Sequence, residues 1–208
     1  MERIILLASG VALCVVMFLL SGCAAITPTD ASRFYVLSPM AESDLEKIVL
    51  PGKTGKISIG IAPITLPKYL KKSQIVTRTG NNELQLAEFD RWAGKIEEDI
   101  GRVVAENLSY LLATDKIVSH PAISSVETDY KIELDLSRFD GRLGESVELV
   151  ARWVILDKQG NTVKNITSTR IKKPVQGFGY ADMVEAQSRA LAALSRDLAE
   201  AITELTEK

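Results

Sequence analysis

Three kinds of hydrophobic pattern occur along the sequence, and each predicts a different element. An apolar run of 17 residues extends from Ile4 to Leu20. Strict alternation of apolar and polar residues, typical of half-buried strands, recurs in the middle of the chain. Apolar residues three and four positions apart, which indicate amphipathic helices, dominate two longer segments. The sequence therefore predicts an apolar leader followed by a domain of strands and helices.

The segments that resemble strands are short and are separated by turn residues. Strands are predicted at residues 33–37, 56–61, 75–78, 83–86, 116–119, 130–136, 147–155 and 162–173. Residues 79–82, Thr-Gly-Asn-Asn, tolerate positive φ and predict a β-hairpin. Short turns also join the last three strands, and this spacing favours an antiparallel meander because parallel strands need longer crossovers.

Two segments have the periodicity of long amphipathic helices. One helix is predicted to begin at Phe89 and to run to Leu111. A second is predicted from about Asp182 to Leu205, with Glu185 placed to close a capping box. The predicted fold is α+β: an antiparallel or mixed β-sheet of about six to eight strands with two long helices packed on one face.

The end of the apolar run, Leu20-Ser21-Gly22-Cys23, has the form of a bacterial lipobox. Arg3 supplies the positive start of an export signal, and Ser21 and Gly22 are the small residues before the cut. A thiol is the nucleophile that takes a diacylglycerol group, so Cys23 is the expected lipid attachment site and first mature residue. An uncleaved anchor helix or a buried core helix are the other interpretations, but neither needs a cysteine at this junction.

The predicted organisation follows from this cut. Residues 1–22 form the lipoprotein signal peptide, residues 23–32 a tether and residues 33–208 a single α+β domain. Stable membrane anchoring takes two or more acyl chains, such as palmitate, and processed lipoproteins normally carry three. Among Gram-negative lipoproteins, Asp after the lipidated cysteine usually retains the protein in the inner membrane. Ala24 stands at this position, which favours the outer membrane.

Composition excludes several classes of function. The net charge of -2 argues against nucleic acid binding, which needs a basic face. Cys14 lies within the signal peptide and Cys23 carries the expected lipid, so no thiol remains for a disulfide or a metal. His120, the only histidine, stands beside Pro121 and supports neither a metal site nor a Ser-His-Asp set. We expect no catalytic residues, no metal and no cofactor beyond covalent lipid on Cys23.

The segment Leu66-Pro67-Lys68-Tyr69-Leu70 is a candidate partner-binding site. Pro67 ends a strand and leaves Tyr69 and Leu70 beside two lysines. An aromatic and aliphatic pair among lysines suits a lipid or partner surface, which would use Leu66, Pro67, Tyr69 and Leu70. The alternative is a strand exit with Tyr69 and Leu70 in the core.

The order and spacing of several motifs resemble a known family. These motifs are the lipobox, Phe34-Tyr35-Val36-Leu37, Leu66-Pro67-Lys68-Tyr69-Leu70, Ile75-Val76-Thr77-Arg78 and Phe89-Asp90-Arg91-Trp92-Ala93. Together they are similar to the PqiC/YmbA lipoproteins, the ABC-type transport auxiliary lipoproteins. The resemblance implies an outer-membrane lipoprotein that faces the periplasm. It also implies partners: a periplasmic protein with MCE domains and its inner-membrane transporter, acting in lipid transport between the membranes and in envelope integrity.

Three alternatives to this adaptor function remain open. A lipid-binding carrier would need a cavity lined by apolar side chains. A structural lipoprotein for outer-membrane assembly would share the anchor and the small α+β domain. An envelope enzyme would have to build its site around His120. A homo-oligomer, such as a ring around a transport conduit, is a sensible geometry for an adaptor.

Overall fold

The computed structural model describes residues 31–40, 57–122 and 126–207. The chain divides into two units, Met1–Ala31 and Ser32–Lys208, and nearly all of the described residues belong to the second. The predicted signal peptide lies outside the described residues.

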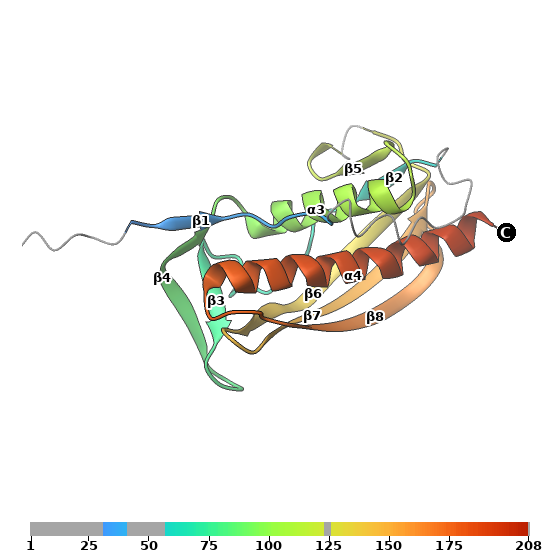
Figure 1. Ribbon diagram of the computed structural model, residues 1–208. Coiled ribbons are helices and arrows are strands. Elements are labelled where there is room, and N and C mark those ends of the chain that lie inside the picture. Colours follow the sequence, from blue (N-terminus) through green and yellow to red (C-terminus); the bar gives the residue numbers. More distant parts are fainter. Residues whose placement is uncertain (1–30, 41–56, 123–125, 208) are drawn as a thin grey trace, which may run out of the picture. The chain divides into compact units, whose positions relative to one another are not determined.

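Within the described ranges, the second unit contains one mixed sheet of eight strands and two long helices (Figure 1). The strands are β1 (Arg33–Tyr35), β2 (Ile59–Ile61), β3 (Gln74–Arg78), β4 (Leu84–Trp92), β5 (Ile117–Ser119), β6 (Tyr130–Arg142), β7 (Ser146–Asp157) and β8 (Thr162–Pro174). The helices are α3 (Ile96–Leu111) and α4 (Tyr180–Thr206). The predicted α+β class is confirmed, as are the β3–β4 hairpin and the antiparallel β6–β7–β8 meander.

Strand β6 holds the two parts of the sheet together. One edge pairs with β7 from Tyr130 to Arg142. The other edge is shared, because β2 pairs in parallel with its first residues and β3 pairs at Gly141. Between them, Thr65 donates its N–H to the Leu134 carbonyl and accepts the N–H of Leu136, both at 3.0 Å. The sheet therefore divides at β6 into a β2–β5 branch and a β3–β4–β1 branch.

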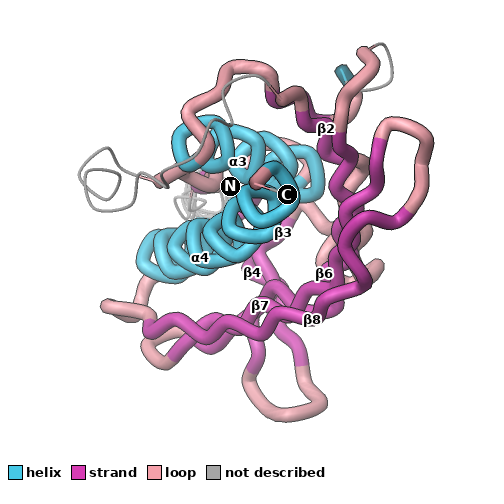
Figure 2. The backbone as a smooth tube through the Cα atoms, turned by 90° about the vertical axis from the view of Figure 1, so that its right-hand side faces the viewer, coloured by secondary structure: helices cyan, strands magenta, loops and turns pink. Residues whose placement is uncertain are grey.

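Both helices pack on the same side of the sheet, and Figure 2 shows them on the inner side of its curve. Helix α4 contacts β6, β7 and β8, while α3 contacts α4 and β5. Alternation explains the packing, since Ile132, Leu134 and Leu136 of β6 are buried and Glu133 between them is exposed. The buried stripes are supplied by Ile100, Val103, Val104, Leu108 and Leu111 of α3 and by Leu191, Leu194, Leu198 and Ile202 of α4.

The predicted start of the first helix and the predicted capping residue of the second are wrong. Phe89 and Trp92 belong to β4, and α3 begins only at Ile96. Their three-residue spacing imitated a helix, but β4 pairs with both β1 and β3, and such tertiary pairing overrides a local pattern. Helix α4 begins earlier than predicted, because Asp182 rather than Glu185 accepts the N–H of the N-cap residue Gly179 at 2.9 Å.

Trp92 tests the packing of the β1–β4 branch, because its side chain is only 7% exposed. Trp92→Ala should lower the free energy of unfolding by about 3 to 5 kcal/mol, the usual cost of emptying a large core site. Denaturant unfolding of the purified domain measures this. Gln85→Ala, at an exposed position of the same strand, is the matched control and should change stability little. A near-zero effect at Trp92 would contradict its assignment to the core.

Candidate functional site

The structure shows where the chain enters the folded unit after the predicted tether. Cys23 lies outside the described residues, so lipid attachment stays a prediction. The first strand, β1, begins at Arg33 and pairs in parallel with the end of β4. A membrane anchor at Cys23 would therefore be linked to the domain through β1.

A buried carboxylate fixes β1 to β4. Asp90, which is almost fully buried, accepts hydrogen bonds from Arg33 Nε at 2.8 Å and from the Tyr35 hydroxyl at 2.7 Å. Hydrogen bonding from Arg33, assisted by Tyr35, outweighs burial and lowers the pKa of Asp90. Burial, followed by the Asp90 charge, raises the pKa of the Tyr180 phenol at the start of α4. One carboxylate thus joins β1 to β4, and its charge acts on the beginning of α4.

The residues after β1, Leu37–Met40, form a connecting segment that both helices hold. On α3, Asp99 accepts the N–H of Leu37 at 2.7 Å, and the Arg102 guanidinium donates to the Leu37 carbonyl at 2.7 Å. The buried Asn107 amide accepts the N–H of Met40 at 2.8 Å. On α4, the Ser188 hydroxyl accepts the N–H of Ser38 at 3.1 Å.

These contacts satisfy the connecting segment without a neighbouring strand. Asn107 also donates to the Ser195 hydroxyl at 3.2 Å, so the same amide joins α3 to α4. Buried backbone groups are normally paired, and here side chains of both helices supply the partners. The segment is consequently part of the helix–helix interface rather than a loop lying over it.

The candidate partner-binding segment lies largely in the core. Leu66 and Leu70 are buried, Pro67 is partly buried, and the Tyr69 hydroxyl donates to Asp140 at 2.8 Å. For Leu66, Pro67, Tyr69 and Leu70, the structure therefore supports the core alternative over an exposed partner surface. The lysines of this segment suggested an exposed surface. They do point to solvent, but the apolar residues between them turn inward.

Tyr69 belongs to a network around Asp140, whose side chain is fully buried. Arg78 Nε lies 2.7 Å and Arg138 Nη2 3.1 Å from one carboxylate oxygen, and Arg138 and Arg170 both pair with Glu148. Burial alone would raise the pKa of Asp140, but the hydrogen bonds from Arg78, Tyr69 and Arg138 hold it below its ordinary value. Burial and then Asp140 raise the pKa of Tyr69 to about 12.

Sequence reasoning missed Asp90, Asn107 and Asp140. Asp140 and Arg78 are 62 residues apart, so no local pattern couples them. The one available signal is an acidic residue at a position of β6 next to the apolar Phe139, which breaks the expected alternation.

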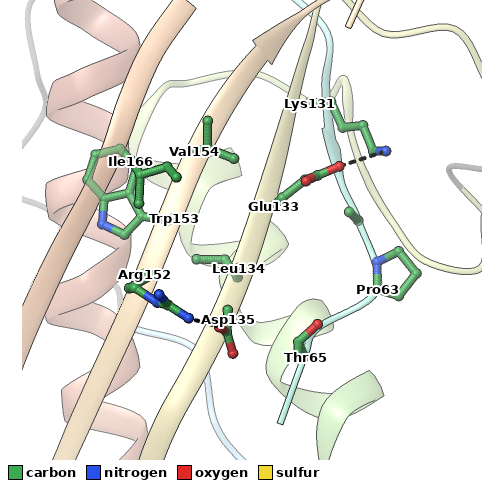
Figure 3. A pocket seen from close by; sticks show the side chains of 11 residues that line it. Pro63, Thr65, Lys131, Glu133, Leu134, Asp135, Arg152, Trp153, Val154 and Ile166 are labelled. Atoms are coloured by element: carbon green, nitrogen blue, oxygen red, sulfur yellow. Dashed lines mark hydrogen bonds and ion pairs between the residues drawn. The ribbon is translucent and has the colours of Figure 1, made fainter. Parts of the chain in front are cut away.

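An open groove lies on the outer face of the sheet, opposite the helices (Figure 3). Its volume is about 500 Å³, and its walls are the 62–65 segment, β6, β7 and Ile166 of β8. Lys131 pairs with Glu133 at 3.2 Å and Arg152 with Asp135 at 2.8 Å along its floor. The lining mixes compensated charges with apolar side chains, so the groove differs from the apolar cavity that a lipid carrier needs.

The described residues contain no group of three or more His, Cys, Asp or Glu side chains that could hold a metal ion. His120 lines shallow hollows together with Pro63. In the part of the chain that the structure describes, no helix is long and apolar enough to cross a membrane.

Removing the Asp140 charge should destabilise the domain. In Asp140→Asn, Arg78 and Arg138 lose a buried counter-ion, and breaking such a pair from one side typically costs about 3 to 5 kcal/mol. Asp135→Asn is the matched control on the same strand, because its pair with Arg152 is largely exposed and should contribute about 0 to 1 kcal/mol. Equal losses in the two variants, measured by urea unfolding, would show that the buried network does not stabilise the fold.

The same network predicts acid sensitivity. Because the pKa of Asp140 is lowered from 3.8, its stabilisation is fully present above that value and is lost as the pH falls through the folded-state pKa. The free energy of unfolding should therefore decrease below about pH 4, and more steeply in the natural protein than in Asp140→Asn. Parallel pH profiles of the two proteins would contradict this assignment.

The chain is similar to solved structures over most of its length. One uncharacterised protein has a TM-score of 0.67 at 19% identity and covers 83% of this chain and 99% of its own. A protein from Xanthomonas campestris also has a TM-score of 0.67, at 15% identity, and covers 83% of this chain and 95% of its own. At these identities the likeness shows a shared fold.

Sequence comparison extends the likeness from fold to family. The intermembrane transport lipoprotein PqiC of Escherichia coli K12 is 23% identical over 166 residues, which are 80% of this chain and 82% of that protein. PqiC of Shigella flexneri matches equally well. A family model described as "ABC-type transport auxiliary lipoprotein component" matches residues 35–199, and this is a family of transport components rather than of enzymes. The resemblance seen in the sequence is confirmed: the chain belongs to the ABC-type transport auxiliary lipoprotein family.

Proposed function

We propose that this protein is the outer-membrane lipoprotein subunit of an MCE-type intermembrane lipid transport system. Lipid on Cys23 holds the domain at the membrane, facing the periplasm, where it docks the periplasmic MCE protein and supports envelope integrity. The inner-membrane transporter is the remote partner of the same system. The observation that carries the proposal is the family match over residues 35–199, preceded in the same chain by a lipobox at residues 20–23.

The entry of the chain into the domain supports a positional function. A pull on the tether would act first on β1, which pairs with β4 and is fixed by the contacts of Arg33 and Tyr35 with Asp90. The connecting segment Leu37–Met40 then passes any load to α3 and α4 through four hydrogen bonds with side chains. Fixing β1 to the body limits the reach of the anchor to the predicted tether, residues 23–32, and a tethered partner gains effective concentration only when the geometry allows both contacts.

The groove in Figure 3 favours the adaptor over a lipid carrier. A carrier shelters acyl chains from water, which requires an enclosed and predominantly apolar site. The groove is open, and ion pairs of Lys131 and Arg152 line it. The helix stripes that could enclose a chain are already buried against the sheet.

Two substitutions separate lipid attachment from membrane sorting. Cys23→Ser should abolish acylation, and the protein should move from the membrane to the soluble periplasmic fraction. Ala24→Asp should keep the acylated amino terminus but shift the protein from outer-membrane to inner-membrane fractions of a density gradient. Mass spectrometry of the mature amino terminus checks the first step. A free Cys23 thiol or an intact Met1 in the natural protein would overturn the anchor.

The transport assignment is tested by affinity purification of the tagged lipoprotein from detergent-solubilised envelopes. We expect a protein with MCE domains among the partners identified by mass spectrometry. If docking requires placement at the membrane, the same protein should be missing when the Cys23→Ser variant is purified. Recovery of outer-membrane assembly factors instead would replace the adaptor with a structural lipoprotein.

A further inference from the structure

Exposed hydrophobic side chains concentrate near the point where the chain enters the domain. Seven large hydrophobic side chains are exposed in the described part of the chain. Three of them lie on β1, on the residue that follows it and on the loop before α4: Phe34, Val36 and Phe178. Phe34 is 65% and Phe178 87% exposed. Single exposed apolar residues need no explanation, but a group of them near a membrane attachment point does.

The structure holds Phe178 in a defined position. Its ring covers the β6–β7 turn so closely that a Cβ on Gly144 would come within 2.6 Å of its Cδ1 atom. Gly144 has a φ of +70°, which suits glycine at this turn. On either side of the ring, the Val175 N–H bonds the Glu145 carbonyl at 3.1 Å and the Gly179 N–H bonds Asp182. An 87% exposed ring on a fixed loop is presented to a partner surface rather than folded away.

Phe178 and β1 are close to each other. Tyr180, two residues after Phe178, is near enough to Asp90 and Arg33 for their charges to act on its phenol, and Arg33 is the first residue of β1. Figure 1 shows β1, β4 and the amino-terminal end of α4 together at one end of the domain. Arg33 and Tyr35 turn toward Asp90, so Phe34 between them lies on the opposite face of the strand.

Charge at this end is mixed. Lys71, Lys72 and Glu88 are exposed, Arg33 is paired with Asp90, and Arg91, on the strand next to Phe34, donates to the Ser73 hydroxyl. A surface held by electrostatic attraction to anionic lipids would show a clear basic excess. Aromatic and aliphatic side chains without that excess instead suit the boundary between headgroups and acyl chains.

We propose that this end of the domain rests on the phospholipid bilayer, with the rings of Phe34 and Phe178 in the headgroup–acyl boundary. The proposal rests on the proposed lipid anchor at Cys23 and adds the orientation of the domain. Nine residues, 24–32, lie between Cys23 and Arg33 and give a reach of at most about 35 Å, so the anchor allows this contact without requiring it. The groove on the outer sheet face then stays clear of the bilayer.

A single introduced thiol tests the orientation. After removal of the predicted signal peptide, the natural chain carries a single cysteine, Cys23, whose thiol is blocked by the attached lipid. Phe178→Cys therefore provides one reactive thiol for an environment-sensitive fluorophore. The labelled lipoprotein, purified in detergent, is reconstituted into phosphatidylethanolamine and phosphatidylglycerol vesicles with brominated acyl chains. Ile166→Cys, 73% exposed and at the groove, is the matched control. We expect a blue shift and at least twofold quenching at position 178, and neither at position 166.

The outcomes separate the orientation from the anchor. The acylated protein could float with the vesicles while the fluorophores at positions 178 and 166 are quenched equally. That result would overturn the orientation and leave the anchor intact. A chain that is not acylated and does not float would overturn both. A blue shift at position 178 in labelled Cys23→Ser protein without vesicles, growing with protein concentration, would assign the patch to a second copy of the chain and overturn the bilayer contact. Quenching at position 178 that persists at high salt supports insertion of the ring into the bilayer. Loss of the quenching at high salt would overturn insertion and indicate attraction between charges instead.

Discussion

The backbone of β6 sets the constraint on which the rest of the structure depends. A strand buried at the centre of a sheet must pair its N–H and C=O groups on both edges, because an unpaired buried group costs free energy. Strand β7 satisfies one edge along its whole length, but no single strand satisfies the other. Strand β2, the backbone of Thr65 and strand β3 share it. The irregular segment between β2 and β3 is held against β6 for this reason, and its apolar residues become core.

The same requirement explains how the amino-terminal segment joins the fold. Beyond β1, none of the strands in the described part of the chain pairs with this segment, so Asp99, Arg102, Asn107 and Ser188 supply the partners of its backbone groups. These side chains come from both helices and tie the entering chain to their interface. In the proposed function, this connection limits the slack between anchor and body to the predicted tether, residues 23–32, and so affects the effective concentration of the docked partner.

Buried charge is concentrated where branches of the sheet meet. Asp140 of β6 joins Arg78 of β3 to Tyr69 of the crossing segment, and Asp90 of β4 holds β1 while its charge acts on Tyr180 at the start of α4. Burial raises the pKa of each carboxyl group, but hydrogen bonds from arginine and tyrosine side chains lower it by more and so favour the ionised form. Their main contribution is to position elements that are distant in sequence, because removing one partner leaves a charge without compensation. They leave the aromatic end near β1 and the groove on the outer face free for contacts.

The sequence by itself determined the class of fold, most strands, the meander and the family. These follow from local periodicity, turn residues and motif order, and periodicity records which face of an element is buried. The sequence did not determine the start of α3, because Phe89 and Trp92 fit a helical spacing until β1 and β3 are paired with β4. It also left Tyr69 and Leu70 open between core and surface. Only tertiary structure decided these positions, because they depend on partners such as Asp140 that lie 71 residues away and that no local pattern encodes.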